Sequence, residues 1–312
     1  MVKTAFIFPG QGSQYVGMGK DLYEGSSTAK ALFDRADEIL KFSISRICFE
    51  GPEEELKQTK NTQPAIFLHS IVLFHLINKA QFEMTAGHSL GEYSALVAAG
   101  ALTFEDGLKL VRLRGELMQQ AGFEHPGTMA AIVGIDSKIV NELCVEASAD
   151  GIVQAANFNS PGQTVVSGSS ASVRKAMEFA KTRGAKIVKE LPVSGAFHSL
   201  LMESARTGLK AALDKTKICD AAIPVYANVT ARPMRFADEI RNLLIRQLIS
   251  PVRWEESVVS MITDGAETFV EIGPGKVLQG LVKRIDGNVK TIGLEKLNDI
   301  TDRKTEIGLL ND

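Results

Sequence analysis

Short apolar runs alternate with longer helical patterns over the N-terminal third of the chain. The runs at residues 4–8 and 82–86 predict buried strands, each followed by a glycine-containing turn. Apolar residues recur at helical spacing in residues 29–40 and 104–120, and residues 64–77 form a nearly continuous apolar stretch that predicts a buried helix. Because strands, turns and helices alternate, this region predicts an α/β core with a parallel sheet.

A different order of elements follows, and it has the βαββαβ pattern of a ferredoxin-like unit. The predicted strands cover residues 128–135, 152–156, 163–167 and 185–191, and the predicted helices cover 137–147 and 170–182, with a turn at 159–162. The α/β pattern then returns, with strands at 223–228 and 268–272 and helices at 238–249, 254–263 and 277–285. We therefore predict a hydrolase-like α/β domain, residues 1–124 and 195–312, that carries the ferredoxin-like subdomain of residues 125–194 as an insertion.

Composition and charge fit an ordinary globular protein. The chain has 312 residues, 45% of them hydrophobic and 23% charged, and its net charge of -2 argues against a nucleic-acid surface. The cysteines, Cys48, Cys144 and Cys219, lie far apart without metal-ligand spacing, which is typical of reduced thiols in a cytoplasmic protein. The N-terminus lacks the apolar core of a signal peptide, and residues 64–77 are too few and too polar to span a bilayer. We expect no metal site and no membrane contact.

Residues 87–91, Gly-His-Ser-Leu-Gly, have the Gly-x-Ser-x-Gly pattern of a nucleophile elbow. In such an elbow a tight strand-to-helix turn requires small flanking residues and places the serine hydroxyl at a helix N-terminus. Free backbone N–H groups at that position can stabilise an oxyanion. Ser89 is therefore the candidate nucleophile for acyl transfer. The alternative is an ordinary glycine-rich turn between a strand and a helix.

A serine nucleophile needs a base, and five histidines are candidates. His69 and His75 lie in the apolar stretch and are expected to be buried or half-buried with their hydrogen bonds satisfied. His88 is inside the elbow, where neighbouring side chains diverge, so we expect it to pack or to form a hydrogen bond. His125 precedes a proline at the domain junction and is expected to be exposed. His198 lies in a loop of small residues at the second junction, which makes it the candidate base.

The order of these residues differs from that of a standard α/β-hydrolase. In that fold the histidine follows both the serine and an acid and comes after the last strands, whereas more than a hundred residues follow His198. The HGGG oxyanion loop of lipases and esterases is also missing from the sequence. Both differences count against a lipase or an esterase.

The glycine-rich loop at residues 9–14 is a candidate for part of an oxyanion hole. It lacks the lysine of a P-loop, and Tyr15 stands where a dinucleotide-binding loop has its third glycine. If the loop lies beside the elbow, the backbone N–H of Gln11 would complete the hole. The alternative is a tight turn after the first strand.

Two arginines lie close together in the predicted helix that follows the elbow. Arg112 and Arg114 are two residues apart, about 200° around a helix, so at most one of them faces the site. An arginine that faces Ser89 would bind a substrate carboxylate with its planar guanidinium. The alternative for either residue is a solvated surface charge.

Seven segments of the chain, taken together, match a known family in order. They are residues 8–14, 87–95, 114–115, 157–168, 195–199, 251–254 and 271–275. With these segments the chain resembles the malonyl-CoA:acyl carrier protein transacylases of bacterial fatty-acid synthesis, and it is similar to the acyltransferase domains of polyketide and fatty-acid synthases. The resemblance extends from residue 4 to about residue 294 and implies a large α/β domain with a ferredoxin-like insertion.

The resemblance implies a role for each catalytic residue. Ser89 would be the nucleophile, and His198 would be the general base and acid. In this family a backbone carbonyl orients the histidine, and its counterpart here is the carbonyl of Gln247. The backbone N–H groups of Gln11 and Leu90 would form the oxyanion hole.

The resemblance also implies how the acyl group is chosen. Arg114 would pair with the free carboxylate of a malonyl group, and Gln63 would line the same pocket. Phe197, directly before the histidine, would crowd the extra methyl group of a methylmalonyl substrate.

The implied reaction is a ping-pong transfer with two partners. Malonyl-CoA would load Ser89, and the phosphopantetheine thiol of holo acyl carrier protein would then accept the malonyl group. No metal or redox cofactor is needed, because each half-reaction exchanges a thioester and an oxygen ester. The carrier is acidic in this family, so Lys186 and Lys189 are candidates for its docking surface; the alternative is that both are ordinary surface lysines.

Three other functions remain as alternatives. A thioesterase would use the same serine to release free malonate. An interaction module on a degenerate acyltransferase fold would lack a nucleophile, a base or an arginine, and the sequence has all three. The chain would also fit an acyltransferase domain of a larger synthase, although Met1 directly before the first predicted strand favours a stand-alone protein.

Overall fold

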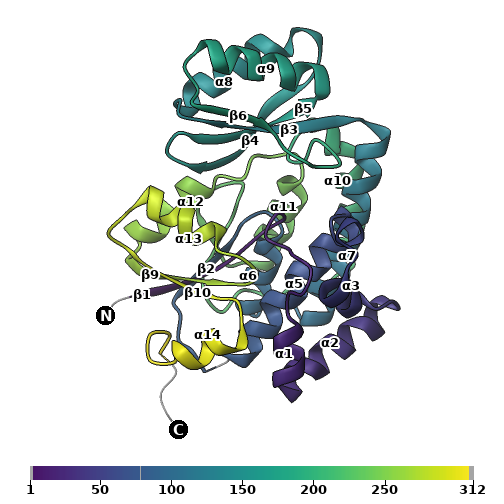
Figure 1. Cartoon of the computed structure of the whole chain (residues 1–312), viewed down its shortest axis with the longest axis vertical. Coiled ribbons are helices and arrows are strands. Elements are labelled where there is room, and N and C mark those ends of the chain that lie inside the picture. The colour runs from purple at the N-terminus through teal and green to yellow at the C-terminus, as the bar shows by residue number, and fades with distance from the viewer. Residues whose placement is uncertain (1–2, 78, 309–312) are drawn as a thin grey trace.

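The computed structural model describes residues 3–77 and 79–308, and a six-stranded, mostly parallel sheet forms the centre of its larger part (Figure 1). The strands lie in the order β10 (Lys290–Leu294), β9 (Ala266–Ile272), β1 (Lys3–Phe8), β2 (Met84–Gly87), β7 (Val225–Tyr226) and β8 (Pro233–Met234). Strands β10 to β7 are parallel, and β8 pairs antiparallel with β7 at the edge. Since Phe8 lies opposite Gly87, the loop after β1 and the elbow after β2 leave the sheet side by side.

Helices cover both faces of this sheet, and alternate residues of β1 show the two sides. Phe6 and Phe8 pack into the large core with the N-terminal helices, whereas Ala5 and Ile7 pack into a second core with α12 and α13. The helices are α1 (Lys20–Gly25), α2 (Ser27–Leu40), α3 (Ile44–Glu50), α4 (Glu53–Leu56), α5 (Thr59–Leu76), α6 (Gly91–Ala98), α7 (Phe104–Glu124), α10 (Glu203–Leu213), α11 (Ala237–Gln247), α12 (Trp254–Thr263), α13 (Val277–Ile285) and α14 (Leu297–Asp302).

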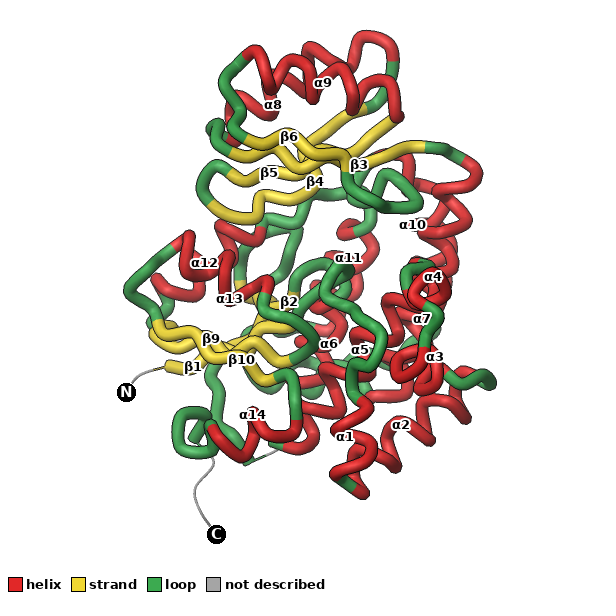
Figure 2. The backbone as a smooth tube through the Cα atoms, in the orientation of Figure 1, coloured by secondary structure: helices red, strands yellow, loops and turns green. Residues whose placement is uncertain are grey.

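A separate four-stranded antiparallel sheet lies above the parallel one (Figures 1 and 2). Its strands have the order β4 (Val153–Ser160), β5 (Gln163–Ser169), β3 (Gly127–Val133) and β6 (Ile187–Glu190). Helices α8 (Ser137–Ala147) and α9 (Ser170–Thr182) cover its outer face, and the other face points toward the large sheet. This is the ferredoxin-like arrangement, so the predicted fold class is confirmed. The division into domains at residues 124–125 and 194–195 stays a prediction.

Several predicted elements differ from the observed ones in length or were not predicted. The strand predicted at 223–228 is reduced to β7, because the chain turns after Ala227 and pairs back as β8. Strand β4 continues to Ser160, so the predicted turn is confined to Pro161 and Gly162. Helices α1, α3, α10 and α14 and the edge strands β8 and β10 were not predicted, since short or surface elements carry weak periodicity.

Within the described ranges, no helix combines the length and the apolar character needed to cross a membrane. The same residues contain no cluster of three or more histidine, cysteine, aspartate or glutamate side chains that would hold a metal ion. The cysteines are free thiols; Cys48 and Cys144 are buried and Cys219 is exposed.

Candidate active site

The elbow between β2 and α6 holds Ser89 in a strained backbone conformation. Its φ is +52°, in the left-handed region that non-glycine residues rarely adopt. The flanking glycines are required by close packing: a Cβ on Gly87 would lie 1.9 Å from the backbone carbon of Gly91, and one on Gly91 would lie 2.1 Å from the carbonyl oxygen of Phe8. The Gly-x-Ser-x-Gly pattern therefore reflects a turn that projects the serine side chain away from the sheet.

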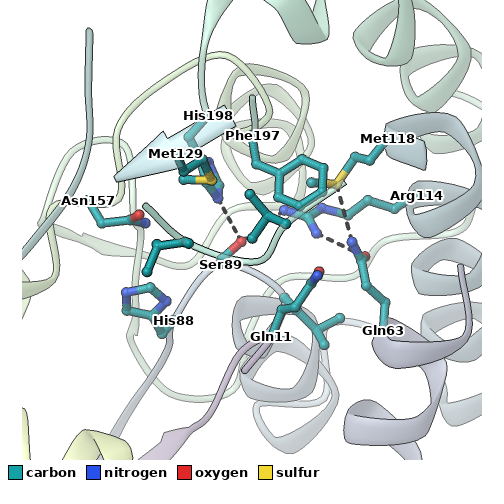
Figure 3. Close-up of a pocket in the computed structure, with 13 residues that line it drawn as sticks. Gln11, Gln63, His88, Ser89, Arg114, Met118, Met129, Asn157, Phe197 and His198 are labelled. Carbon is teal, nitrogen blue, oxygen red and sulfur yellow. Dashed lines mark hydrogen bonds between the residues drawn. The ribbon is translucent and has the colours of Figure 1, made fainter. Parts of the chain in front are cut away.

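His198 lies against the serine and has a defined tautomer. Its Nε2 is 2.8 Å from Ser89 Oγ (Figure 3). Its Nδ1 is 2.9 Å from the carbonyl oxygen of Gln247 and 3.2 Å from that of Ser250. Carbonyl oxygens only accept hydrogen bonds, so the proton is on Nδ1 and Nε2 is free to accept the serine proton. His198 itself has a φ of +58°, so both partners are held at strained backbone positions.

The environment keeps His198 neutral. Burial lowers the pKa of the imidazole to about 3, and the positive charge of Arg114 acts in the same direction. The hydrogen bonds to the two backbone carbonyls only partly oppose this effect. A neutral imidazole with an accepting Nε2 is the form that a general base requires.

Arg114 on α7 brings a buried guanidinium to the same serine. The side chain is 1% exposed, and its Nη2 donates to Ser89 Oγ at 3.1 Å and to Gln247 Oε1 at 2.9 Å. Its Nη1 donates to Gln63 Oε1 at 2.9 Å, and its Cζ lies 5.7 Å from the centre of the Tyr93 ring. Ser89 Oγ thus lies between an imidazole nitrogen that can accept its proton and a fixed cation.

Arg112 turns away from this site, as the helical spacing predicted for one of the two arginines. Its Nε pairs with Glu116 at 2.6 Å, and its guanidinium stacks over the ring of Phe42. Its Nη1 also donates to Asn61 Oδ1 at 2.8 Å, so Arg112 joins α7 to the start of α5 away from Ser89.

The two predicted oxyanion donors, Gln11 and Leu90, line the same cavity as Ser89. Neither the backbone N–H of Gln11 nor that of Leu90 has a hydrogen-bond partner within the described residues. The N–H of Ser89, in contrast, is occupied, because it donates to Asn228 Oδ1 at 2.7 Å. The N–H groups of Gln11 and Leu90 are therefore available to a developing negative charge.

Two cavities share part of their lining, and the first of them contains Ser89. The first, of about 110 Å³, is lined by Gln11, Gln63, His88, Ser89, Leu90, Arg114, Met118, Met129, Asn157, Leu191, Val193, Phe197 and His198 (Figure 3). The second, of about 190 Å³, shares Gln11, His88, Asn157 and Leu191 with the first and continues toward α13. Together they provide a small acyl pocket and an approach to it between the two sheets.

The histidine beside the nucleophile has a packing role, as its place in the elbow predicted. His88 Nε2 is 2.9 Å from Asn159 Oδ1, and its ring lies 5.7 Å from that of Trp254. Burial lowers its pKa, so it is neutral. This contact joins the elbow to β4 of the small sheet.

The remaining histidines agree with the sequence predictions except in one respect. His75 is half-buried and bonds through Nδ1 to the Ile71 carbonyl at 2.8 Å, and His125 is exposed. His69 is buried, but the prediction that its hydrogen bonds are satisfied is wrong: neither ring nitrogen has a partner within the described residues. Burial lowers its pKa to about 4, so the core accommodates the neutral ring.

Asn228 supports the elbow and was not predicted. Its Oδ1 accepts from the Ser89 N–H, its Nδ2 donates to the Gly87 carbonyl at 2.7 Å, and its own N–H donates to Glu92 Oε2 at 3.0 Å. The Asn228 side chain thus provides hydrogen-bond partners for the N–H of Ser89 and the carbonyl of Gly87, which the sharp turn takes out of the regular sheet pairing. The only sequence signal was its position at the end of a predicted strand, where polar side chains of an α/β fold gather at the site.

Gln154 on β4 supports the histidine and was also not predicted. Its Nε2 donates to the carbonyls of His198 and Ile249 at 3.2 and 3.4 Å, and its Oε1 accepts from the Leu200 N–H at 3.3 Å. It therefore ties the histidine loop to the loop that orients the imidazole. No local pattern distinguishes it from any polar residue of an alternating strand.

Comparison with known proteins finds acyltransferases that are similar to this chain over nearly its whole length. The acyl transferase domain family matches residues 5–294. A malonyl CoA-acyl carrier protein transacylase of Bacillus subtilis is 50% identical over 297 residues, which cover 94% of each chain. A solved structure of the malonyl CoA-acyl carrier protein transacylase from Coxiella burnetii superposes with a TM-score of 0.94 at 39% identity, covering 100% of this chain and 98% of the other.

A further solved structure places a transacylase of this type on its protein partner. It is a type II polyketide synthase acyl carrier protein in complex with its malonyl transacylase, which matches with a TM-score of 0.94 at 37% identity and covers 97% of this chain and 99% of that chain. The chain therefore belongs to the acyl transferase domain family and, within it, to the malonyl CoA-acyl carrier protein transacylases.

Proposed function

We propose that this enzyme transfers a malonyl group from malonyl-CoA to the phosphopantetheine thiol of holo acyl carrier protein in fatty-acid synthesis, through a malonyl ester on Ser89. The observation that carries the proposal is the buried Arg114 guanidinium, 3.1 Å from Ser89 Oγ. A fixed cation beside the nucleophile favours an acyl group that ends in a carboxylate.

In the first half-reaction Ser89 attacks the thioester carbonyl carbon of malonyl-CoA. His198 Nε2 takes the hydroxyl proton as the C–O bond forms, and the N–H groups of Gln11 and Leu90 donate to the carbonyl oxygen as it becomes negative. When the tetrahedral intermediate collapses, the C–S bond breaks and the proton passes from His198 to the departing thiolate. The products are the malonyl ester and coenzyme A.

The carboxylate of the bound malonyl group pairs with Arg114. Gln63 holds one side of the guanidinium, and Gln63 Nε2 is itself fixed at 3.2 Å from the Met118 sulfur. Phe197 is buried in the wall of the same pocket, where it leaves little room for a second carbon branch. A malonyl group therefore fits better than an acetyl group, which lacks the anion, or a methylmalonyl group, which is wider.

The second half-reaction reverses the first with a different thiol. His198 takes the proton of the phosphopantetheine thiol, the thiolate attacks the ester carbonyl, and Ser89 leaves with the proton returned by His198. Each half-reaction exchanges a thioester for an oxygen ester or the reverse, so atoms and electrons balance without a metal or a redox cofactor. Water must be kept from the ester between the two steps, which favours the narrow pocket over an open esterase cleft.

The substrates and the partner suggest where the enzyme acts and where the carrier docks. We assign it to the cytoplasm, in keeping with its free thiols, including the exposed Cys219. Lys186 and Lys189 are both exposed beside and on β6, so they are available to the acidic carrier protein. Their role in docking is a proposal that charge-reversal variants would test.

The low pKa of His198 predicts the pH dependence of ester formation. Protonation removes the base only as the pH falls toward about 3, whereas an ordinary histidine would lose it below about 6.5. At saturating malonyl-CoA we expect the single-turnover rate to change less than about twofold between pH 8 and pH 5. Rapid-quench measurement of the malonyl ester after brief pH jumps tests this, and a half-maximal rate near pH 6.5 would contradict it.

One assay tests the function itself. The enzyme is mixed with malonyl-, acetyl- or methylmalonyl-CoA, with or without holo acyl carrier protein, and both proteins are weighed intact by mass spectrometry. We expect a malonyl adduct on the enzyme that moves to the holo carrier but not to the apo carrier, and little adduct from the other two substrates. Rapid release of free malonate that does not depend on the carrier would show a thioesterase instead.

A further inference from the structure

Glu92 is a buried residue of α6, the helix that follows the elbow, and only one of its two carboxylate oxygens accepts hydrogen bonds. The side chain is 0% exposed. Its Oε2 accepts from the N–H of Asn228 at 3.0 Å and from Gln247 Nε2 at 2.9 Å, whereas its Oε1 has no partner among the described residues. A buried carboxylate is costly unless a cation compensates it or a proton neutralises it.

The nearest compensating charge is Arg114, and one amide joins the two groups. Gln247 donates through Nε2 to Glu92 and accepts through Oε1 from Arg114 Nη2 at 2.9 Å. A second bond from Nε2 to the Ser89 carbonyl at 3.0 Å fixes the direction of this amide. Glu92 and Arg114 are therefore linked through a single polarised side chain in a buried part of the molecule.

No other buried side chain around this helix carries charge near neutral pH. Helix α6 packs against α5, α7, β1, β2 and β7. The buried titratable side chains that these elements and the loop of the base provide, within the described residues, are Tyr93, His69, Tyr226, His198 and Arg114. Burial raises the pKa of both tyrosines and lowers that of both histidines, to about 4 for His69 and about 3 for His198, so these four are neutral. Arg114 is left as the counter-charge of Glu92.

Binding of a malonyl group changes the balance of charge between Glu92 and Arg114; this step rests on the function proposed above. Its carboxylate would bring a second anion to the one buried cation. We propose that Glu92 is the buried counter-ion of Arg114 before the substrate binds, and that it takes up a proton from solvent when the malonyl carboxylate pairs with this arginine. One anion then faces Arg114 in each state: ionised Glu92 before the substrate binds and the malonyl carboxylate afterwards.

The geometry around Glu92 suits a carboxyl that gains and loses a proton. The unpartnered Oε1 can carry the proton while both hydrogen bonds to Oε2 remain in place. Burial raises the pKa of Glu92 to about 7, against the opposing effects of its hydrogen bonds and of Arg114. A second anion about 10 Å away, in an effective dielectric of about 20, would favour the protonated form by about a further tenfold.

The sign of the resulting pH effect follows directly. Below about pH 7 Glu92 is already protonated, and the malonyl carboxylate binds Arg114 without a competing anion. Above this pH Glu92 is ionised, so binding must also supply a proton and becomes weaker. We expect KM for malonyl-CoA to rise about tenfold between pH 6 and pH 9 and the single-turnover rate at saturation to stay nearly constant.

The test compares the wild type with Glu92→Gln and a matched control. The glutamine oxygen can accept the same two hydrogen bonds without a charge, so KM should stay at the wild-type value for pH 6 over the whole range. Glu116→Gln removes the same charge from the exposed face of α7, the helix that carries Arg114, and should retain the wild-type rise. A pH indicator in weak buffer at about pH 7.5 should report uptake of about half a proton per malonyl ester in the wild type and none in Glu92→Gln.

The outcomes separate this inference from the proposed function. A wild-type KM that is flat from pH 6 to pH 9, or a rise that persists in Glu92→Gln, would overturn the role of Glu92. If the wild type takes up no proton when the malonyl ester forms, the inference is overturned even if the variant does not fold. Failure of the wild type to form any malonyl ester would instead overturn the function on which the inference rests.

Discussion

Replacing Ser89 by alanine is expected to abolish formation of the malonyl ester and to lower transfer to the carrier by at least about 10⁴-fold, because no other group can form the covalent intermediate. The described pocket contains no second hydroxyl or thiol in contact with His198 Nε2. The remaining Arg114 and oxyanion donors would still bind malonyl-CoA, so the loss should fall on the rate and leave binding nearly intact. Intact-protein mass after incubation with malonyl-CoA measures it.

A second serine of the same region provides the control for this variant. Ser194 is exposed near the pocket, and its Oγ lies 3.0 Å from Thr59 Oγ1 instead of the base. Ser194→Ala should retain its malonyl adduct. Alanine at position 89 must also adopt the backbone φ of +52°, so thermal unfolding of both variants separates loss of chemistry from loss of fold. A Ser89→Ala enzyme that still transfers malonyl groups would rule out the serine-ester mechanism.

The sequence predicted those parts of the site that are local in the chain. The elbow at 87–91 is readable because a tight strand-to-helix turn needs glycines at fixed positions, and the packing distances around Gly87 and Gly91 show the constraint directly. The ferredoxin-like order of strands and helices at 127–190 is readable because its alternating and helical periods are regular. The position of His198 was chosen from its loop of small residues, without any contact that the sequence alone displays.

The contacts that hold the site together were mostly not predictable, because they join residues far apart in the chain. Asn228 looks like an ordinary polar residue until β7 pairs with β2 and its side chain reaches Ser89. Gln154 on β4 likewise shows its role only when the small sheet lies against the loop of His198. The neutral, unpartnered ring of His69 and the buried charge of Glu92 depend on what covers them, which hydrophobic periodicity does not report. The family resemblance supplied the carbonyl of Gln247, but only the folded chain shows that its side chain also links Glu92 with Arg114.

Arg114→Ala is expected to lower malonyl transfer by between about 30-fold and several thousand-fold while changing acetyl transfer much less, because a buried charge that loses its partner costs about 2–5 kcal/mol. The malonyl carboxylate would enter the pocket beside Gln63 and Gln247 with no cation, whereas an acetyl group has no carboxylate to pair. The variant also removes the positive charge that helps to lower the pKa of His198. Rates should therefore be compared at about pH 8, where the imidazole is neutral in both proteins.

Arg112→Ala is the matched control, since it removes the same guanidinium from the same helix at a site that pairs with Glu116. It should leave the preference for malonyl over acetyl unchanged. Arg114 also donates to Ser89 Oγ and Gln247, so part of any loss reflects the position of the nucleophile, and that part must affect both acyl groups equally. The ratio of the two losses isolates recognition of the carboxylate. Equal losses for malonyl and acetyl would mean that Arg114 only positions the serine, and the choice of malonyl would then have to come from the shape of the pocket around Phe197.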